Sequence, residues 1–247
     1  MRLDVFFTPA EVTPGDTSGR LVAIIDVLRA STTVAVALAN GAKTVVPLPT
    51  ADEVIVRSRD FAKSAVRTAG EQKMLPIPGF DFGNSPGLFT AEAVEGKTIL
   101  LTTSNGTRAL LGVQGARDIV IASYVNLTAV LTLMKMASGS DTDITIICAA
   151  EDGLFALEDA ACAGRFVRSI PKRAGLVMND AALASVLVDK KYGENIAKIF
   201  QDSSHGQALK AAGFGDDLAT AAAVDSYSVV PIYQDRQITK VGPERER

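Results

Sequence analysis

The sequence predicts an α/β protein, layered as α/β/α around a mostly parallel or mixed central sheet. Three observations lead to this fold class. Short β-branched and aliphatic runs alternate with segments of helical periodicity along much of the 247-residue chain. These runs show little polar alternation, which is typical of strands buried on both faces. In addition, 47% of the residues are hydrophobic and 21% are charged, as expected for a globular chain with a substantial core.

The predicted strands and helices alternate in five pairs. We expect strands over residues 20–27, 42–49, 97–102, 118–123 and 143–150. Each is followed by a helix, and these helices span residues 30–41, 51–64, 107–112, 126–137 and 157–170. Alternation of this kind predicts a mostly parallel sheet that helices cover.

The rest of the chain is less regular. Residues 179–223 are predicted to be mainly helical, with breaks at Gly193, 203–206 and 213–217, and a late strand follows over 228–233. We expect one compact domain over residues 1–240, whose two halves could meet near residues 123–126, and a solvated tail over 241–247.

The longest irregular stretch covers residues 70–87 and is rich in Gly and Pro. A loop of this length inside a compact domain is usually functional or disordered. Its aromatic residues Phe80 and Phe82 favour an ordered loop that covers a site.

Charge and composition exclude several classes of protein. The net charge is −3, and acids and bases are interspersed, so nucleic acid is not an expected partner. No apolar run has the length that spans a bilayer, and Asp4 interrupts the segment where a signal peptide would be apolar. Together with two free thiols, Cys148 and Cys162, these features predict a cytoplasmic protein without a membrane partner.

The single histidine, His205, restricts the metal chemistry. Sites that need two histidines are excluded, so a metal would be held mainly by carboxylates and water, which favours magnesium or manganese. A lone histidine in a loop or at a helix start is most often structural. As the only side chain that normally titrates near neutral pH, however, His205 is also a candidate proton donor.

Polar segments follow four of the predicted strands, and ligands of α/β sheets bind beyond the carboxyl ends of the strands. The segments are residues 26–33, 102–107, 123–126 and 149–159. Asp26 could cap the following helix, ligate a metal or activate water. Arg29 could bind an anionic group through its forked guanidinium.

The second of these segments concentrates hydrogen-bonding groups at a strand-to-helix junction. It contains Thr103, Ser104, Asn105, Gly106 and Thr107. One or two of these residues could cap the helix, as Ser, Thr and Asn commonly do. Alternatively, the segment could bind an anion at the helix start, where Gly106 would allow close approach of a ligand.

Two further features have competing interpretations. Glu158 and Asp159 are adjacent at a helix start, where they could complement the helix dipole or, as neighbouring carboxylates, bind a divalent cation. The segment from Cys162 to Ser169 has the Cys-x5-Arg-Ser spacing of cysteine-dependent phosphatases. Its apolar residues nevertheless recur at helical spacing, so we expect Cys162 to lie inside a helix.

Several motifs occur in the order found in the 2-phosphosulfolactate phosphatase family, which this sequence resembles from about residue 21 to residue 232. They are IDVLRASTT (25–33), GFDFGNSP (79–86), TTSNGTRAL (102–110), CAAEDGLFALEDAACAG (148–164), SSHGQAL (203–209) and DDLATAAAVD (216–225). The resemblance implies an α/β fold peculiar to the family. It also implies a magnesium-dependent, homodimeric phosphatase that hydrolyses 2-phospho-3-sulfolactate, a reaction of coenzyme M biosynthesis in methanogens.

With that resemblance, site roles can be placed on this chain. Catalysis is assigned to Asp26, Arg29 and His205, and magnesium binding to Asp26, Glu158 and Asp159. Substrate binding is assigned to Arg29, Ser31, Thr32, Asn84, Ser85, Thr103, Ser104, Asn105, Gly106, Thr107 and Arg108.

Two positions depart from the family pattern, Gln72 in place of an arginine and Glu151 after the Cys-Ala-Ala run. They leave two alternatives open: a phosphatase of another small phosphorylated acid, and a non-catalytic relative that binds anions.

Overall fold

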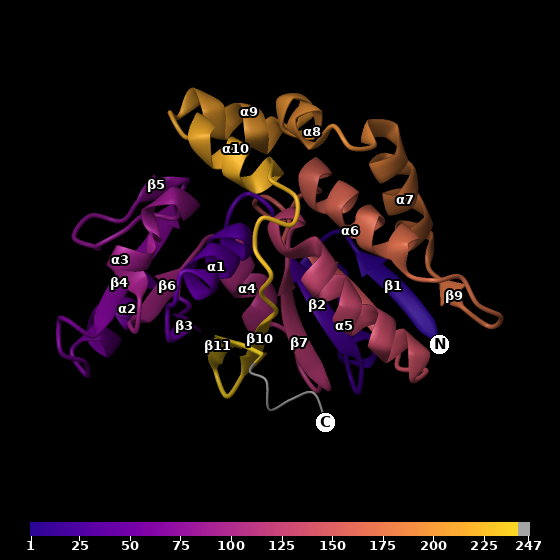
Figure 1. Ribbon diagram of the computed structural model, residues 1–247, viewed down its shortest axis with the longest axis horizontal. Coiled ribbons are helices and arrows are strands. Elements are labelled where there is room, and N and C mark those ends of the chain that lie inside the picture. Colours follow the sequence, from indigo (N-terminus) through magenta and orange to yellow (C-terminus); the bar gives the residue numbers. More distant parts are fainter. Residues whose placement is uncertain (242–247) are drawn as a thin grey trace.

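The computed structural model describes residues 1–241 as an α/β fold built on one mixed sheet of eleven strands (Figure 1). The strand order is β5-β4-β6-β3-β11-β10-β7-β2-β8-β1-β9. The layered α/β/α class predicted from the sequence is therefore confirmed, with a mixed sheet. Residues 242–247 of the predicted tail lie outside the described residues, and the division into one domain or two stays a prediction.

Most of the strands belong to two parallel blocks. The larger block contains β7 (Asp118–Ala122), β2 (Leu21–Ile25), β8 (Ile144–Cys148), β1 (Arg2–Phe6) and β9 (Val177–Met178). The smaller block contains β4 (Val66–Gln72), β6 (Thr98–Thr102) and β3 (Thr44–Pro47), and β5 (Leu75–Pro76) pairs antiparallel with β4 at its edge.

A hairpin late in the chain joins the two blocks. Its strands are β10 (Pro231–Gln234), which pairs antiparallel with β7, and β11 (Gln237–Lys240), which pairs antiparallel with β3. Three successive antiparallel pairings thus separate β7 from β3, so the two blocks run in opposite directions. Figure 1 shows the hairpin at the junction, with one block on either side.

Ten α-helices are described within residues 1–241. They are α1 (Ala30–Ala39), α2 (Ala51–Ser58), α3 (Ala91–Val94), α4 (Gly106–Leu111), α5 (Leu127–Gly139), α6 (Leu157–Ser169), α7 (Asp180–Tyr192), α8 (Ile196–Asp202), α9 (Ser204–Ala211) and α10 (Gly215–Ala222). In Figure 1, α8, α9 and α10 form a cap over the end of the molecule that lies opposite the hairpin.

The alternation of side chains along the strands divides the interior into two main cores. In β2, Leu21, Ala23 and Ile25 pack with α5 and α6 in the first core. Val22 and Ile24 face the second core, which also contains residues of α1, α4 and the smaller block. Because α1 and α4 pack against both blocks, the turns before these helices come together although the blocks run in opposite directions.

The five predicted strand–helix pairs are all present, with one boundary clearly wrong. The helix expected over residues 51–64 ends at Ser58, and β4 begins at Val66. The strands β1, β4 and β11 were not predicted, because each is short or mixes polar with apolar residues. The stretch expected to be irregular over 70–87 contains the end of β4 and all of β5.

Candidate active site

A cavity of about 320 Å³ lies where the turns after β2, β6 and β8 meet the β4–β5 hairpin and α9. Its position agrees with the rule that ligands of α/β proteins bind beyond the carboxyl ends of the strands. Its walls are formed by Asp26, Leu28, Arg29, Glu71, Lys73, Met74, Asn84, Thr103, Ser104, Asn105, Glu151, Asp152 and His205.

Asp26 directly follows β2 and has two kinds of contact. Its Oδ1 accepts a hydrogen bond of 3.0 Å from the Ala30 N–H, so the side chain does stabilise the start of α1. The carboxylate also lines the cavity. Burial raises its pKa to about 6, and the charges of Glu71 and Glu158 act in the same direction, while His205 opposes them. A carboxylate of this kind can accept a proton near neutral pH or bind a cation.

Gly106 contributes to the site differently from what the sequence suggested. A Cβ atom at this position would lie 2.6 Å from Asp26 Oδ2 and 2.7 Å from Ala30 Cβ. Real Cβ atoms essentially never make contacts this short. The absence of a side chain at Gly106 therefore allows α4 to pack against the turn after β2. The close approach predicted for a ligand is made by the protein's own Asp26.

The hydroxyl-rich turn before α4 forms hydrogen bonds with the Glu71 carboxylate of the protein itself. Ser104 donates its backbone N–H to Glu71 Oε1 at 2.7 Å and its hydroxyl to Oε2 at 3.1 Å. Thr103 and Thr107 bond each other, since the N–H of each donates to the Oγ1 of the other. Asn105 Oδ1 accepts from the Asp152 N–H at 3.2 Å. Much of the hydrogen-bonding capacity of this turn is thus used by other groups of the protein.

Arg29 lines the cavity, but protein groups surround its guanidinium. Nη1 donates to Asp217 Oδ2 at 2.8 Å and to Ser85 Oγ at 3.3 Å. Nη2 donates to the Met74 carbonyl at 2.7 Å, and the guanidinium carbon lies 4.5 Å from the centre of the Phe214 ring. The Ser85 hydroxyl also donates to Asp217, at 2.8 Å. Arg29 and Ser85 therefore connect the turn after β2 to α10 and to the β4–β5 hairpin.

Ser31 and Thr32, both assigned to substrate binding, lie behind the cavity and do not line it. Ser31 Oγ accepts from the Asp26 N–H at 2.9 Å. Thr32 is fully buried, donates to the Val27 carbonyl and shares a hydrogen bond of 2.8 Å with the Ser123 hydroxyl. These contacts make the two side chains part of the support of the turn, and their assignment to substrate binding stays a prediction.

His205 faces the cavity from α9 and is held by Glu158 of α6. Its Nδ1 lies 3.1 Å from Glu158 Oε1, which leaves the other ring nitrogen for a ligand. Burial alone would lower the pKa of His205, but the hydrogen bond and the charge of Glu158 outweigh burial and raise this pKa. The imidazole is therefore kept protonated at neutral pH more than a free histidine would be, as a proton donor requires.

The acids predicted to bind metal are close enough to interact, but they have different surroundings. Asp159 Oδ1 accepts from the Val27 N–H at 2.9 Å, so Asp159 stabilises the turn after β2. Burial raises its pKa well above the usual value, and the charges of Asp26 and Glu158 add to the effect. Glu158 Oε2 is buried and has no hydrogen-bond partner within residues 1–241.

The predicted metal ligands Asp26, Glu158 and Asp159 offer carboxylate oxygens, which are the ligands that a hard divalent cation prefers. No group of three or more His, Cys, Asp and Glu side chains in residues 1–241 is arranged to hold a metal ion. Magnesium typically binds through one or two carboxylates and takes its remaining ligands from substrate phosphate and water. Asp26, which lines the cavity, and the buried, unpartnered Oε2 of Glu158 are the carboxylate groups available for such a role, and the magnesium assignment stays a prediction.

Several residues of the cavity were not identified from the sequence. Glu71 and Lys73 belong to the stretch predicted to be irregular. Asp217, which does not line the cavity but pairs with Arg29, belongs to a predicted helix break. Arg108, in contrast, was assigned to substrate binding but lines a neighbouring cavity of about 720 Å³. The two cavities share Glu71, Thr103, Ser104 and Asp152 as walls.

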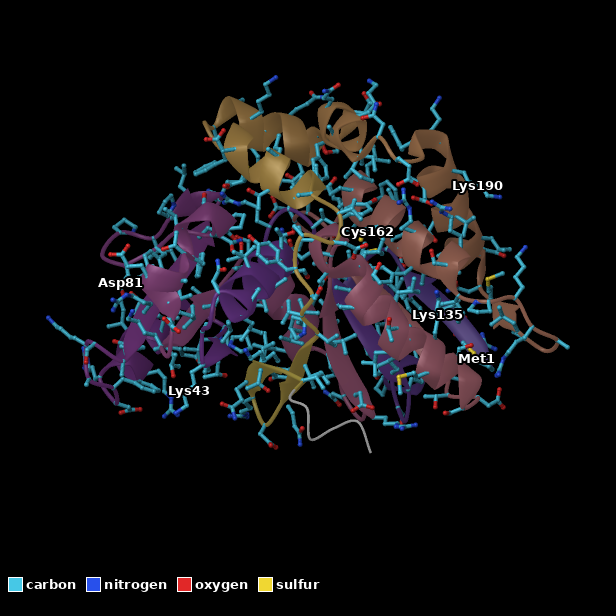
Figure 2. The ribbon with its side chains drawn as sticks, viewed as in Figure 1. Met1, Lys43, Asp81, Lys135, Cys162 and Lys190 are labelled. Carbon is cyan, nitrogen blue, oxygen red and sulfur yellow. The ribbon has the colours of Figure 1, made fainter. Side chains whose placement is uncertain are left out.

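Cys162 lies in the interior of α6, as the helical spacing predicted (Figure 2). Burial raises the pKa of its thiol well above the usual value. A thiol that stays protonated is a poor nucleophile, so the spacing of Cys162 to Ser169 does not mark a cysteine-phosphatase loop.

Comparison with known proteins relates the whole chain to a family. The family model described as 2-phosphosulpholactate phosphatase matches residues 6–236. A protein of Symbiobacterium thermophilum, named probable 2-phosphosulfolactate phosphatase, is 38% identical over 232 residues, which cover 93% of this chain and 96% of the relative. Relatives with the same name are 33% identical in Caldanaerobacter subterraneus subsp. tengcongensis, covering 94% and 95% of the two chains, and in Clostridium acetobutylicum, covering 96% and 100%.

None of the helices within residues 1–241 is both long and apolar enough to cross a membrane.

Proposed function

Because this chain belongs to the 2-phosphosulpholactate phosphatase family, we propose that it hydrolyses the phosphate monoester of 2-phospho-3-sulfolactate with the help of magnesium. The products would be 3-sulfolactate and inorganic phosphate. A cytoplasmic location, a homodimeric state and a contribution to coenzyme M biosynthesis belong to the same proposal.

The observation that carries the proposal is the arrangement of Asp26 and His205 on one cavity. The pKa values of both groups are raised, that of Asp26 to about 6 by burial and that of His205 because the hydrogen bond and charge of Glu158 outweigh burial. A carboxylate that titrates near neutral pH and a histidine that favours its protonated form suit acid–base catalysis. They support a reaction in which one group accepts a proton and another donates one.

In the proposed reaction a water molecule attacks phosphorus and the bond between phosphorus and the ester oxygen breaks. His205 would donate its proton to the departing ester oxygen, so that sulfolactate leaves with a hydroxyl group and not an alkoxide. Asp26 would orient the attacking water and accept its proton. Glu158 would hold the imidazole in position and stabilise its charge, and Asp159 would hold the turn that carries Asp26.

The charge of the cavity supports a cation. Four carboxylates line it, those of Asp26, Glu71, Glu151 and Asp152, and Asp217 already neutralises Arg29. A substrate with three anionic groups would be repelled from such a wall. A magnesium ion held by Asp26 and Glu158 Oε2 would, when bound, neutralise phosphate oxygens and lower the pKa of water.

The proposal is tested by measuring phosphate release from 2-phospho-3-sulfolactate and from a panel of other small phosphorylated acids, with magnesium and with EDTA. We expect turnover of 2-phospho-3-sulfolactate to exceed that of the other acids, to stop in EDTA and to return with magnesium. A preference for another acid would correct the substrate, and full turnover in metal-free EDTA would contradict the metal. No phosphate release from any compound would favour a non-catalytic relative that binds anions.

A further inference from the structure

The turn of the β4–β5 hairpin reaches the cavity in an unusual way. Gln72 pairs with Leu75, so the turn consists of Lys73 and Met74, and both have positive φ, at 51° and 69°. Two-residue turns with this backbone strongly prefer Asn-Gly or similar pairs. Residues that tolerate this region poorly persist mainly where function uses their side chains.

Groups of the candidate active site fix this turn on both sides. The Met74 N–H donates to Glu71 Oε2 at 2.9 Å, and the Met74 carbonyl accepts from Arg29 Nη2 at 2.7 Å. The backbone of Lys73 is therefore positioned by the same side chains that line the cavity. Its side chain lies in the cavity wall while it remains accessible to solvent.

Lys73 also supplies a positive charge that no acid neutralises. Arg29 is paired with Asp217 at 2.8 Å, and His205 with Glu158 at 3.1 Å. Over residues 1–241, the Lys73 ammonium forms no ion pair with a carboxylate within 4.0 Å. It is the cation of this cavity that remains available for an anionic ligand.

Asn84 gives a second, independent indication of a ligand in the same cavity. The residue is 4% exposed, and its side-chain Oδ1 has no hydrogen-bond partner among the described residues. Buried amides are normally paired, because an unpaired one costs free energy. Asn84 lies in the cavity wall, so its Nδ2 can donate to an anionic oxygen of a ligand there.

We propose that Lys73 and Asn84 form the subsite that binds the non-reacting acid groups of the substrate, away from the phosphate that is hydrolysed. This inference rests on the proposed function, since a substrate with carboxylate and sulfonate groups in addition to its phosphate needs a place for them. The ammonium supplies charge and the amide supplies a directed hydrogen bond. Both residues belong to the segment from Gly70 to Gly87, which also contributes Glu71 and Met74 to the cavity wall.

The test is the binding of 3-sulfolactate and of inorganic phosphate, each measured by titration calorimetry with wild-type protein and with Lys73→Met. We expect Lys73→Met to weaken 3-sulfolactate binding at least about tenfold, as loss of a charged hydrogen bond does, while phosphate binding stays unchanged. Lys73→Arg, which keeps the charge, should retain most of the affinity. Asn84→Ala should weaken 3-sulfolactate selectively as well.

Lys43→Met is the matched control, because Lys43 is an exposed lysine just before β3, away from the cavity (Figure 2). Equal affinity of Lys73→Met and wild type for 3-sulfolactate, or no binding of it by wild type, would overturn the inference. An equal loss of phosphate affinity would also overturn it, since Lys73 would then hold the phosphate. Selective loss of 3-sulfolactate binding in a protein without phosphatase activity would keep the subsite and reject the proposed function.

Discussion

The turn after β2 and the turn after β6 have much in common in the sequence, yet they use their polar groups differently. Both lead from a buried strand into a helix and both border the same cavity. In the first turn, burial raises the pKa of the Asp26 carboxylate. The same carboxylate lines the cavity. In the second turn, Ser104 donates its N–H and hydroxyl to Glu71, and Thr103 bonds with Thr107.

The comparison shows that a high density of hydrogen-bonding residues does not by itself locate a ligand. In the second turn, the donors assigned to a substrate phosphate are used by a carboxylate from β4. The first turn contains fewer polar groups, but it places a poorly neutralised charge at the cavity. A binding site is better identified by the groups that the fold leaves unsatisfied.

The largest effect is expected for Asp26→Asn. We expect kcat/KM to fall by about 10³-fold, within the range for loss of a group that takes part in proton transfer. The thermal midpoint should not fall, because the change removes a buried charge that faces Glu158 and Asp159. Enzyme kinetics beside calorimetry measure both quantities, with the exposed Asp60→Asn as a control. A variant that melts lower but stays active would show that Asp26 serves only as a helix cap.

Gly106→Ala tests the contact between the two turns. The new Cβ would meet Asp26 Oδ2 and Ala30 Cβ, so α4 or Asp26 must move. We expect a loss of about 1–3 kcal/mol in the free energy of unfolding, as for other overpacked sites. A catalytic group displaced by about 1 Å typically lowers kcat/KM about 10²-fold.

The control for this substitution is Gly112→Ala at the other end of α4, where a Cβ would have ordinary contacts of 3.4 Å and more. Denaturant unfolding and kinetics should separate the two variants. If Gly106→Ala behaved like the control, the close packing of the two turns would not be needed for activity.

A smaller effect is expected for Ser104→Ala. The hydroxyl bonds to Glu71, so its removal should cost about 1 kcal/mol of stability, the usual net value of one hydrogen bond. Activity should change little. Asn105→Ala should behave similarly, because Asn105 Oδ1 accepts from the Asp152 backbone. Either variant losing most of its activity with a normal thermal midpoint would instead support an anion site made by the second turn.

The smallest effect is expected outside both turns, at the buried thiols. Burial raises the pKa of Cys148 and of Cys162, so neither should react with Ellman's reagent at pH 8 in the folded protein. Both should react after denaturation in urea. Cys162→Ser should retain activity, and rapid labelling of the folded protein, accompanied by inactivation, would contradict the assigned helical interior.

Much of the fold could be predicted because its buried strands are continuous apolar runs and its longer helices show their periodicity. The strand at Leu21–Ile25 and the helix at Leu157–Ser169 are the respective examples. The strand at Val66–Gln72 was missed, since polar residues occupy more than half of it and its burial depends on β6.

The candidate site was predicted less completely than the fold. Asp26, His205 and Asn84 line the cavity. Asp26 was noted at the end of a strand and His205 at a helix start, whereas Asn84 was assigned through the motif resemblance. The partners that decide the roles of site residues come from distant parts of the chain, as Asp217 does for Arg29 and Glu71 for Ser104. Local patterns carry no information on such pairings, so the sequence did not indicate that Ser31 and Thr32 lie outside the cavity wall.

The late hairpin of β10 and β11 has a consequence for biosynthesis. Both parallel blocks precede it in the chain, so a ribosome completes them before it makes the strands that join them. Until then, β3 and β7 each expose an unpaired edge, and such edges promote aggregation of nascent chains. Folding during translation therefore ends with the closure of the sheet, and a chain interrupted before Pro231 would be a natural target for chaperones and proteases.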